Sequence, residues 1–161
     1  MRKGIFLLIS AIVVLPMAPA QATVSTTGDN GQVLSIKSAR VKAGSVIKVS
    51  GNGFDETVGI YLAICVIPEK GKAPTPCGGG VNKAGLGEAS VWISSNAPAY
   101  AAGLTEEFLP GGRFTHNLSV SQRIGKFDCR KVRCAVTVRS DHLRTGDRTN
   151  DLFIPITIRK K

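Results

Sequence analysis

Short runs of alternating apolar and polar residues, separated by glycine, proline and Asp/Asn turns, constrain the fold of this chain more than any other feature. The alternation is clearest in 46–50, 113–120 and 152–158. Successive side chains of a strand point to opposite faces, so this period predicts strands with one buried and one wet face. No window of a dozen residues fits a helical period better, and we expect almost no helix.

Seven such runs occur between Val33 and Ile158, at 33–37, 46–50, 59–66, 89–94, 113–120, 134–139 and 152–158. Half-buried strands in one domain of this size must form two sheets that cover each other. We therefore expect an all-β fold, an immunoglobulin-like seven-stranded antiparallel sandwich. Pro155 inside the last run predicts an edge or a bulge there, because proline has no N–H to pair.

The N-terminus has the pattern of a secretory signal peptide. Arg2 and Lys3 precede an apolar run over 5–15, and small residues stand at Ala20 and Ala22. The apolar run is too short to span a bilayer, so cleavage after Ala22 is expected, and residues 1–22 form the signal peptide. Polar, glycine-rich residues 23–32 predict a flexible arm, and 33–161 predict one domain. The protein is expected to be secreted or at the cell surface, and monomeric.

Four cysteines remain after this segment: Cys65, Cys77, Cys129 and Cys134. An even number of cysteines in an exported chain predicts disulfides, and four cysteines allow three pairings. Proximity in sequence favours the two short-range pairings, Cys65 with Cys77 and Cys129 with Cys134. The spacings lack the paired C-x2-C knuckles of structural zinc sites, so no metal site is expected.

Basic residues concentrate near the C-terminus. Loss of Arg2 and Lys3 lowers the net charge from +10 to +8, and 123–161 contain eleven Lys and Arg against four Asp. Such a surface favours an anionic polymer such as DNA, a wall polymer or lipid headgroups, although it also serves solubility alone. The candidate anion-binding residues are Arg123, Lys126, Arg130, Lys131 and Arg133.

Catalytic patterns are missing from the sequence. His116 is in phase with Phe114 and Leu118, which favours a core or cleft position, and His142 follows Asp141 in a charged loop. No nucleophile elbow, HExxH helix or Walker loop occurs. We expect a non-enzymatic protein with no cofactor.

Aromatic residues gather around the second of two long connections, 67–87 and 96–112. Long loops at the end of a rigid sandwich often carry binding sites. The candidate ligand-binding residues are Trp92, Tyr100, Phe108 and Phe114, although Trp92 and Phe114 also suit a packed core.

Several of these features resemble the neocarzinostatin family of antitumour-antibiotic apoproteins, over about 33–158. The similar residues are the segment 46–54 (VIKVSGNGF), Tyr61, the four cysteines, Phe114 and Asp128. The resemblance implies a seven-stranded immunoglobulin-like sandwich with disulfides 65–77 and 129–134. It also implies an enediyne chromophore in an apolar cleft beside the first disulfide, with antibacterial and DNA-directed activity. Segments 97–100 and 147–155 look more like the neocarzinostatin-like modules of exported actinobacterial surface proteins, some of which are attached to haem-acquisition domains.

The sequence therefore predicts a secreted module that binds an apolar small molecule in a cleft. The alternative is a cell-surface adhesin, or an accessory of haem or nutrient uptake, that holds an anionic polymer on its basic face. A cleft lined by the aromatic residues favours the first, and a filled core with a continuous basic face favours the second.

Overall fold

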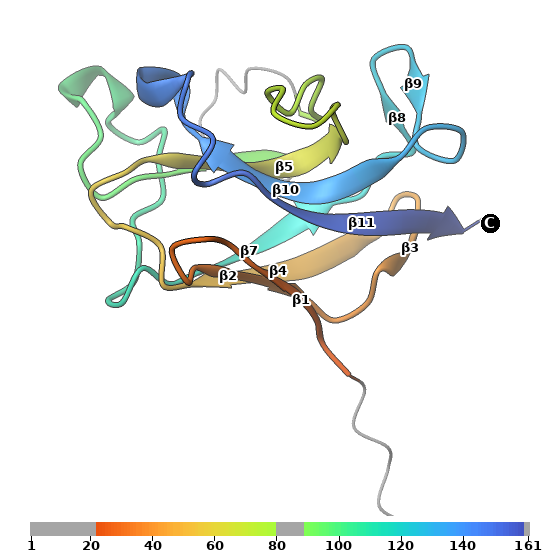
Figure 1. Ribbon diagram of the computed structural model, residues 1–161, viewed down its shortest axis with the longest axis horizontal. Coiled ribbons are helices and arrows are strands. Elements are labelled where there is room, and N and C mark those ends of the chain that lie inside the picture. Colours follow the sequence, from red (N-terminus) through yellow and green to blue (C-terminus); the bar gives the residue numbers. More distant parts are fainter. Residues whose placement is uncertain (1–21, 80–88, 160–161) are drawn as a thin grey trace, which may run out of the picture.

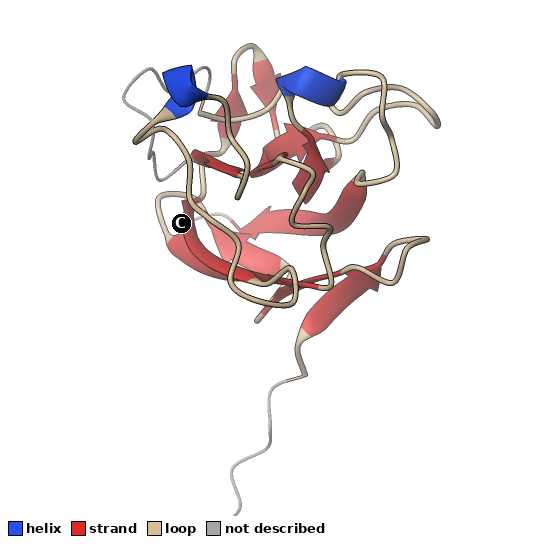
Figure 2. Cartoon of the chain, turned by 90° about the vertical axis from the view of Figure 1, so that its left-hand side faces the viewer, coloured by secondary structure: helices blue, strands red, loops and turns tan. Residues whose placement is uncertain are grey.

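Two β-sheets pack face to face in the computed structural model, which describes residues 22–79 and 89–159 (Figure 1). Residues 1–21, 80–88 and 160–161 lie outside the described residues. Of the expected signal peptide, only Ala22 is described. The all-β class and the sandwich are confirmed. Figure 2 shows the strands in their two layers, with two short 3-10 turns at one end of the molecule.

The first sheet has four antiparallel strands in the order β1-β2-β4-β7. Their bounds are β1 (Val24–Thr27), β2 (Val33–Ile36), β4 (Val46–Asn52) and β7 (Phe114–Ser119).

The second sheet has five strands in the order β3-β11-β10-β5-β6, and all neighbours are antiparallel except β3 and β11. Their bounds are β3 (Arg40–Lys42), β11 (Leu152–Arg159), β10 (Cys134–Ser140), β5 (Ile60–Val66) and β6 (Ser90–Ile93). A separate hairpin of β8 (Arg123–Ile124) and β9 (Phe127–Asp128) projects from the sandwich (Figure 1).

Each of the seven predicted runs overlaps one strand, although β4, β10 and β11 extend one or two residues further, and the structure adds β1, β3, β8 and β9. The added strands have only two to four residues, too few to show a period in the sequence. β3 has a single buried residue, Val41, and is held by its parallel pairing with the end of β11.

The prediction of a flexible arm over 23–32 was wrong. Val24–Thr27 forms β1, which pairs with all of β2, and the backbone N–H of Gly28 donates to the carbonyl of Gln32 at 2.8 Å to close the turn. Val24 packs against the core while Ser25 and Thr27 face solvent. An edge strand needs only this one apolar contact, because its backbone bonds do not depend on side-chain polarity.

Pro155 lies where β11 has a free edge. It pairs with Ala135 of β10 on one side, whereas β3 joins β11 only from Thr157 onward. The missing N–H therefore costs no ladder bond with β3, as the sequence predicted for this position.

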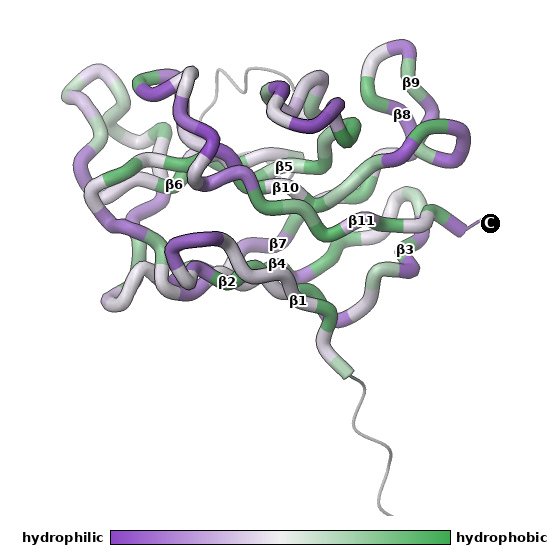
Figure 3. Tube along the Cα trace, in the orientation of Figure 1, coloured by the Kyte–Doolittle hydropathy of each residue, from purple (hydrophilic) through white to green (hydrophobic). Residues whose placement is uncertain are grey.

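The core is the layer between the two sheets, and it is built from the alternate apolar residues of the strands. Figure 3 shows hydrophobic stretches along the strands and hydrophilic ones in the connections. Fully buried members from both sheets include Leu34, Val49, Leu118, Leu62 and Val136. Both short-range disulfides, Cys65–Cys77 and Cys129–Cys134, are confirmed.

Helical structure is limited to the two 3-10 turns, η1 (Ala99–Ala101) and η2 (His142–Arg144), within the described ranges. None of the helices described is long and apolar enough to cross a membrane.

The connection before β7 runs against the end of β4. The carbonyl of Gly112 accepts from the N–H of Phe54 at 3.2 Å, and a Cβ on Gly112 would lie 1.8 Å from the Phe54 carbonyl oxygen. Its neighbour Gly111 also has a positive φ, but nothing lies within 4 Å of its Cβ position.

Substitutions at these two glycines allow the cost of the backbone conformation to be measured apart from the cost of the close contact. Gly111→Ala should lower the free energy of unfolding by about 1 to 2 kcal/mol, the cost of a left-handed residue. Gly112→Ala should cost at least about 2 kcal/mol more, because the Phe54 backbone must also move. Urea denaturation of both variants measures the difference, and equal losses would contradict the close approach.

Candidate functional site

The outer face of the five-stranded sheet carries a row of large side chains. Trp92 of β6 lies opposite Tyr61 of β5, and Tyr61 lies opposite Arg139 of β10. Their sequence neighbours on these strands, such as Leu62 and Val138, point into the core. The Tyr61 and Trp92 rings are 5.9 Å apart between centroids. The row is therefore on the side of the sheet that faces away from the sandwich interior.

His142 from η2 lies beside this row and connects it to η1. Its ring is 4.8 Å from that of Trp92, edge to face, and 6.0 Å from that of Tyr61. The Tyr61 hydroxyl bonds to His142 Nδ1, and the Tyr100 hydroxyl lies 2.8 Å from Nε2. In a neutral imidazole one ring nitrogen accepts and the other donates, so both tyrosine hydroxyls have a partner. We call Tyr61, Trp92, Tyr100 and His142 the aromatic cluster.

Asp141 holds two parts of the aromatic cluster in place through hydrogen bonds. Its side chain is buried, Oδ2 accepts a 3.0 Å bond from Trp92 Nε1, and Oδ1 caps η2 by accepting from the N–H of Leu143 at 3.0 Å. One carboxylate thus orients both the indole and the turn that carries His142. Burial raises the pKa of the Tyr61 phenol, and the nearby Asp141 carboxylate raises it further.

Toward the C-terminal end of β5, the outer face of the five-stranded sheet carries small residues and then a disulfide. Ala63 and Thr137 are paired and buried, although they point away from the core. Beyond them the Cys65–Cys77 bond holds the segment 74–79 against the sheet, where the N–H of Gly78 donates to the Ile64 carbonyl at 2.7 Å. Arg139 Nη1 donates to the Pro74 carbonyl at 3.1 Å. This segment gives the face a wall next to the first disulfide.

Only two of the four predicted ligand-binding aromatics belong to the aromatic cluster. Trp92 and Tyr100 meet through His142, and the Tyr100 side chain is 64% exposed. Phe108 and Phe114 are 7% and 4% exposed and pack with Phe54 inside the core, at centroid distances of 6.4 and 5.4 Å. The structure does not bring these two phenylalanines to the outer face.

His116 occupies a partly buried position on β7, on the same face as Phe114 and Leu118, as its phase in the sequence indicated. Its side chain is 12% exposed and its Nδ1 lies 3.0 Å from Glu106 Oε1. It is therefore separate from the aromatic cluster.

The predicted anion-binding residues lie together on one projecting part of the molecule. All five are exposed, and they lie on the β8–β9 hairpin and the loop closed by Cys129–Cys134. Figure 3 shows hydrophilic stretches along this part of the chain. Asp128 is the one acidic residue between 121 and 134, and it forms a 3.5 Å ion pair with Arg130. We call residues 121–134 the basic lobe.

Sequence reasoning missed Tyr61, Asp141 and His142 as members of a site. Tyr61 was noted only as part of a strand and of the family resemblance, and His142 is 81 positions away from it. Their proximity follows from the pairing of β5 with β10, whose end leads directly into η2. No local pattern in the sequence carries that information.

Comparisons with known proteins give one similar fold. No protein-family model matches the chain, and neither does any curated protein. A solved structure of macromomycin, an enediyne chromoprotein apoprotein of the neocarzinostatin family, is similar at 16% sequence identity, with a TM-score of 0.48. The match covers 86% of this chain and 100% of the macromomycin chain.

The role of Asp141 predicts a specific effect on the aromatic cluster. Asp141→Ala should lower the free energy of unfolding by about 2 to 4 kcal/mol, because η2 loses its cap and the buried indole N–H loses its acceptor. Trp92 is the single tryptophan, so its emission should shift to longer wavelength as water reaches the indole.

Asp141→Asn provides the control. It keeps one acceptor oxygen at the same position and should give a smaller loss. Unchanged emission in Asp141→Ala would show that Asp141 does not hold the indole.

Proposed function

We propose that this protein is a non-enzymatic binding module that holds a planar, largely apolar small molecule against the aromatic cluster. The observation that carries the proposal is that four ring side chains lie together on the outer face of the sheet, with Tyr100 and His142 exposed. Trp92 is 8% exposed and Tyr61 is half-buried, so Tyr100 and His142 form the open part of the aromatic cluster, and aromatic rings stack well on planar ligands.

Rigidity of the aromatic cluster supports the same proposal. Trp92 is fixed by Asp141, and His142 is fixed by hydroxyl groups on both sides. A ligand then loses little affinity to the ordering of side chains. Both nitrogens of His142 are used by the tyrosine hydroxyls, but each hydroxyl keeps a free lone pair that can orient a polar substituent of the ligand.

Export is part of this proposal. Two disulfides and no free cysteine suit an oxidising, extracellular environment, in agreement with the expected signal peptide. If the bound molecule is a reactive chromophore, as the family resemblance implies, antibacterial and DNA-directed activity would belong to that molecule and the protein would be its carrier.

Titration of Trp92 emission with haem, and separately with a neutral polycyclic aromatic such as pyrene, tests the proposal. We expect a saturable change for at least one probe. Tyr100→Ala should weaken its binding by about tenfold, the effect of losing one ring contact. Tyr100 suits this test because its exposed side chain is not needed for the core.

Val46→Ala is the matched control, since Val46 is 55% exposed on the other sheet. Its affinity should equal that of the wild type. A saturable response that Tyr100→Ala leaves unchanged, or no response to either probe, would contradict the proposal.

The basic lobe favours a second candidate function, the retention of the protein on an anionic polymer. Five exposed cations around one acidic residue attract polyanions. The basic lobe has no helix that could enter a DNA groove and contact the bases, so this attraction does not depend on nucleotide sequence. Such binding is driven by counterion release and weakens steeply with salt.

A duplex of random-sequence DNA is the probe for this second function. Lys131→Gln combined with Arg133→Gln should reduce the slope of log affinity against log salt by about two, one for each lost contact. Lys48→Gln on β4 is the control and should leave the slope unchanged. Affinity that does not depend on salt would rule out charge as the driving force.

A further inference from the structure

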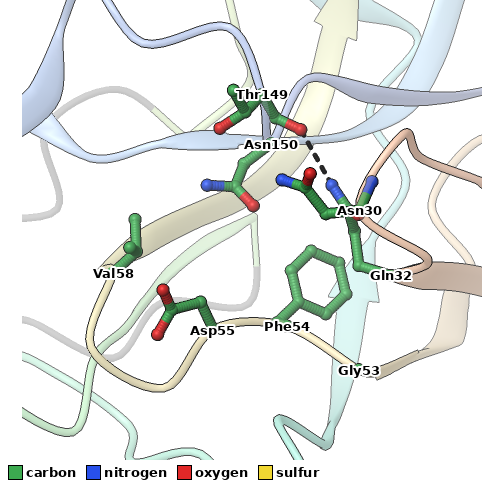
Figure 4. Close-up of a pocket in the computed structure, with 8 residues that line it drawn as sticks. All are labelled: Asn30, Gln32, Gly53, Phe54, Asp55, Val58, Thr149 and Asn150. Atoms are coloured by element: carbon green, nitrogen blue, oxygen red, sulfur yellow. Dashed lines mark hydrogen bonds between the residues drawn. The ribbon is translucent and has the colours of Figure 1, made fainter.

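A polar cavity lies at the end of the sandwich where three connections meet (Figure 4). They are the β1–β2 turn, the β4–β5 connection and the β10–β11 loop. The cavity has a volume of about 270 Å³ and shares no residue with the aromatic cluster or the basic lobe. This size is near the lower end for small-molecule sites and suits a single sugar unit.

Three polar side chains present unused hydrogen-bonding groups to this cavity. Among the described residues, no bond is made by Asp55 Oδ2, by Asn150 Oδ1 or by the side-chain amide of Asn30. Asn150 is only 6% exposed. Figure 4 shows the Asn150 oxygen pointing toward the space above Phe54, and the Asp55 carboxylate on the far side of Asp55 from that ring, toward Val58.

The other polar atoms of Asp55 and Asn150 are already held in place. Asp55 Oδ1 accepts from the N–H and the hydroxyl of Thr57, at 2.8 and 2.7 Å. Asn150 Nδ2 donates to Ser140 Oγ at 3.1 Å. The free oxygens are therefore oriented before any ligand arrives, which limits the entropy lost on binding.

One hydrogen bond also joins two of the three connections, from Gln32 of the β1–β2 turn to Thr149 of the β10–β11 loop. Gln32 is 1% exposed, its Nε2 donates to the Thr149 carbonyl at 2.8 Å, and its Oε1 accepts from the N–H of Asn30 at 3.0 Å. Phe54 and Val58 supply the apolar part of the lining, and Figure 4 shows them on different sides of Asp55. The cavity thus combines fixed amides, one carboxylate and an aromatic ring.

We infer that this cavity binds a neutral saccharide unit, a function beyond the proposed carriage of an apolar molecule. Sugar hydroxyls donate to carboxylate and amide oxygens and accept from an amide NH₂, while the C–H face of the ring packs on aromatic carbon. The cavity offers the polar groups from Asp55, Asn150 and Asn30, and the small exposed part of Phe54, a core residue that is 4% exposed, supplies aromatic carbon.

Charge argues for a neutral sugar. Bonds from the Thr57 hydroxyl and N–H hold the pKa of Asp55 below its ordinary value, so the carboxylate is ionised at neutral pH and repels acidic sugars. A calcium ion is less suited, because it takes six to eight oxygen ligands and this lining provides a single carboxylate.

NMR titration of the ¹⁵N-labelled protein tests the inference. Glucose, galactose, mannose and N-acetylglucosamine are added separately at millimolar concentration. At least one sugar should shift the amide signals of Asn30, Asp55 and Asn150 saturably. Asp55→Asn and Asn30→Ala should each weaken this sugar about tenfold, because each removes one bond to it.

Two controls separate this site from the others. Asn117→Ala, an exposed change on β7, should leave sugar binding unaltered. Tyr100→Ala should do the same, so failure of the carriage proposal leaves this result intact. The inference is overturned if no sugar shifts these signals saturably, or if the shifts persist unweakened in Asp55→Asn and Asn30→Ala. It is also overturned if calcium chloride alone binds there more tightly than every sugar.

Discussion

The close approach of the chain at the end of β4 is the constraint on which the rest of the structure depends. Gly51 lies opposite Phe114 in the ladder, and a Cβ there would meet the phenyl ring at 2.0 Å. The ring therefore lies over a bare backbone and packs with Phe54 and Phe108. This packing closes one end of the core and fixes both loops that leave it. Phe108 and Phe114 are buried in this packing, so the ligand contacts that we propose come from residues outside the core.

The side chains at which we propose ligand binding are held in place by residues of the sheet beneath them. The buried Asp141 carboxylate connects the indole of Trp92 to the turn that carries His142. Gly59 makes room for it, since a Cβ there would lie 2.1 Å from Asp141 Oδ2. Hydrogen bonds thus hold the outer face in place, although Tyr100 and His142 are exposed. Such a surface is suited to recognition without any conformational change.

Side-chain patterns in the sequence predicted the longer strands and the disulfides. They did not predict structure that depends on backbone pairing alone. Alternation predicted β4, β7 and β11, and cysteine spacing predicted both disulfides. β1 was mistaken for a loose arm because its polar side chains hide a complete ladder with β2. Trp92 and Tyr100 could be chosen from their place near a long loop. Their partners Tyr61 and His142 could not, since strand pairing brings them together from positions 81 residues apart.

The central claim is that a planar ligand binds to the aromatic cluster on the outer face and not inside the sandwich. Intermolecular nuclear Overhauser effects from a bound polycyclic aromatic test it most directly, because they identify the protons in contact. The account predicts contacts from the ligand to the ring protons of Trp92, Tyr100 and His142. Contacts to Phe108 and Phe114 instead, with none to Trp92, would contradict it.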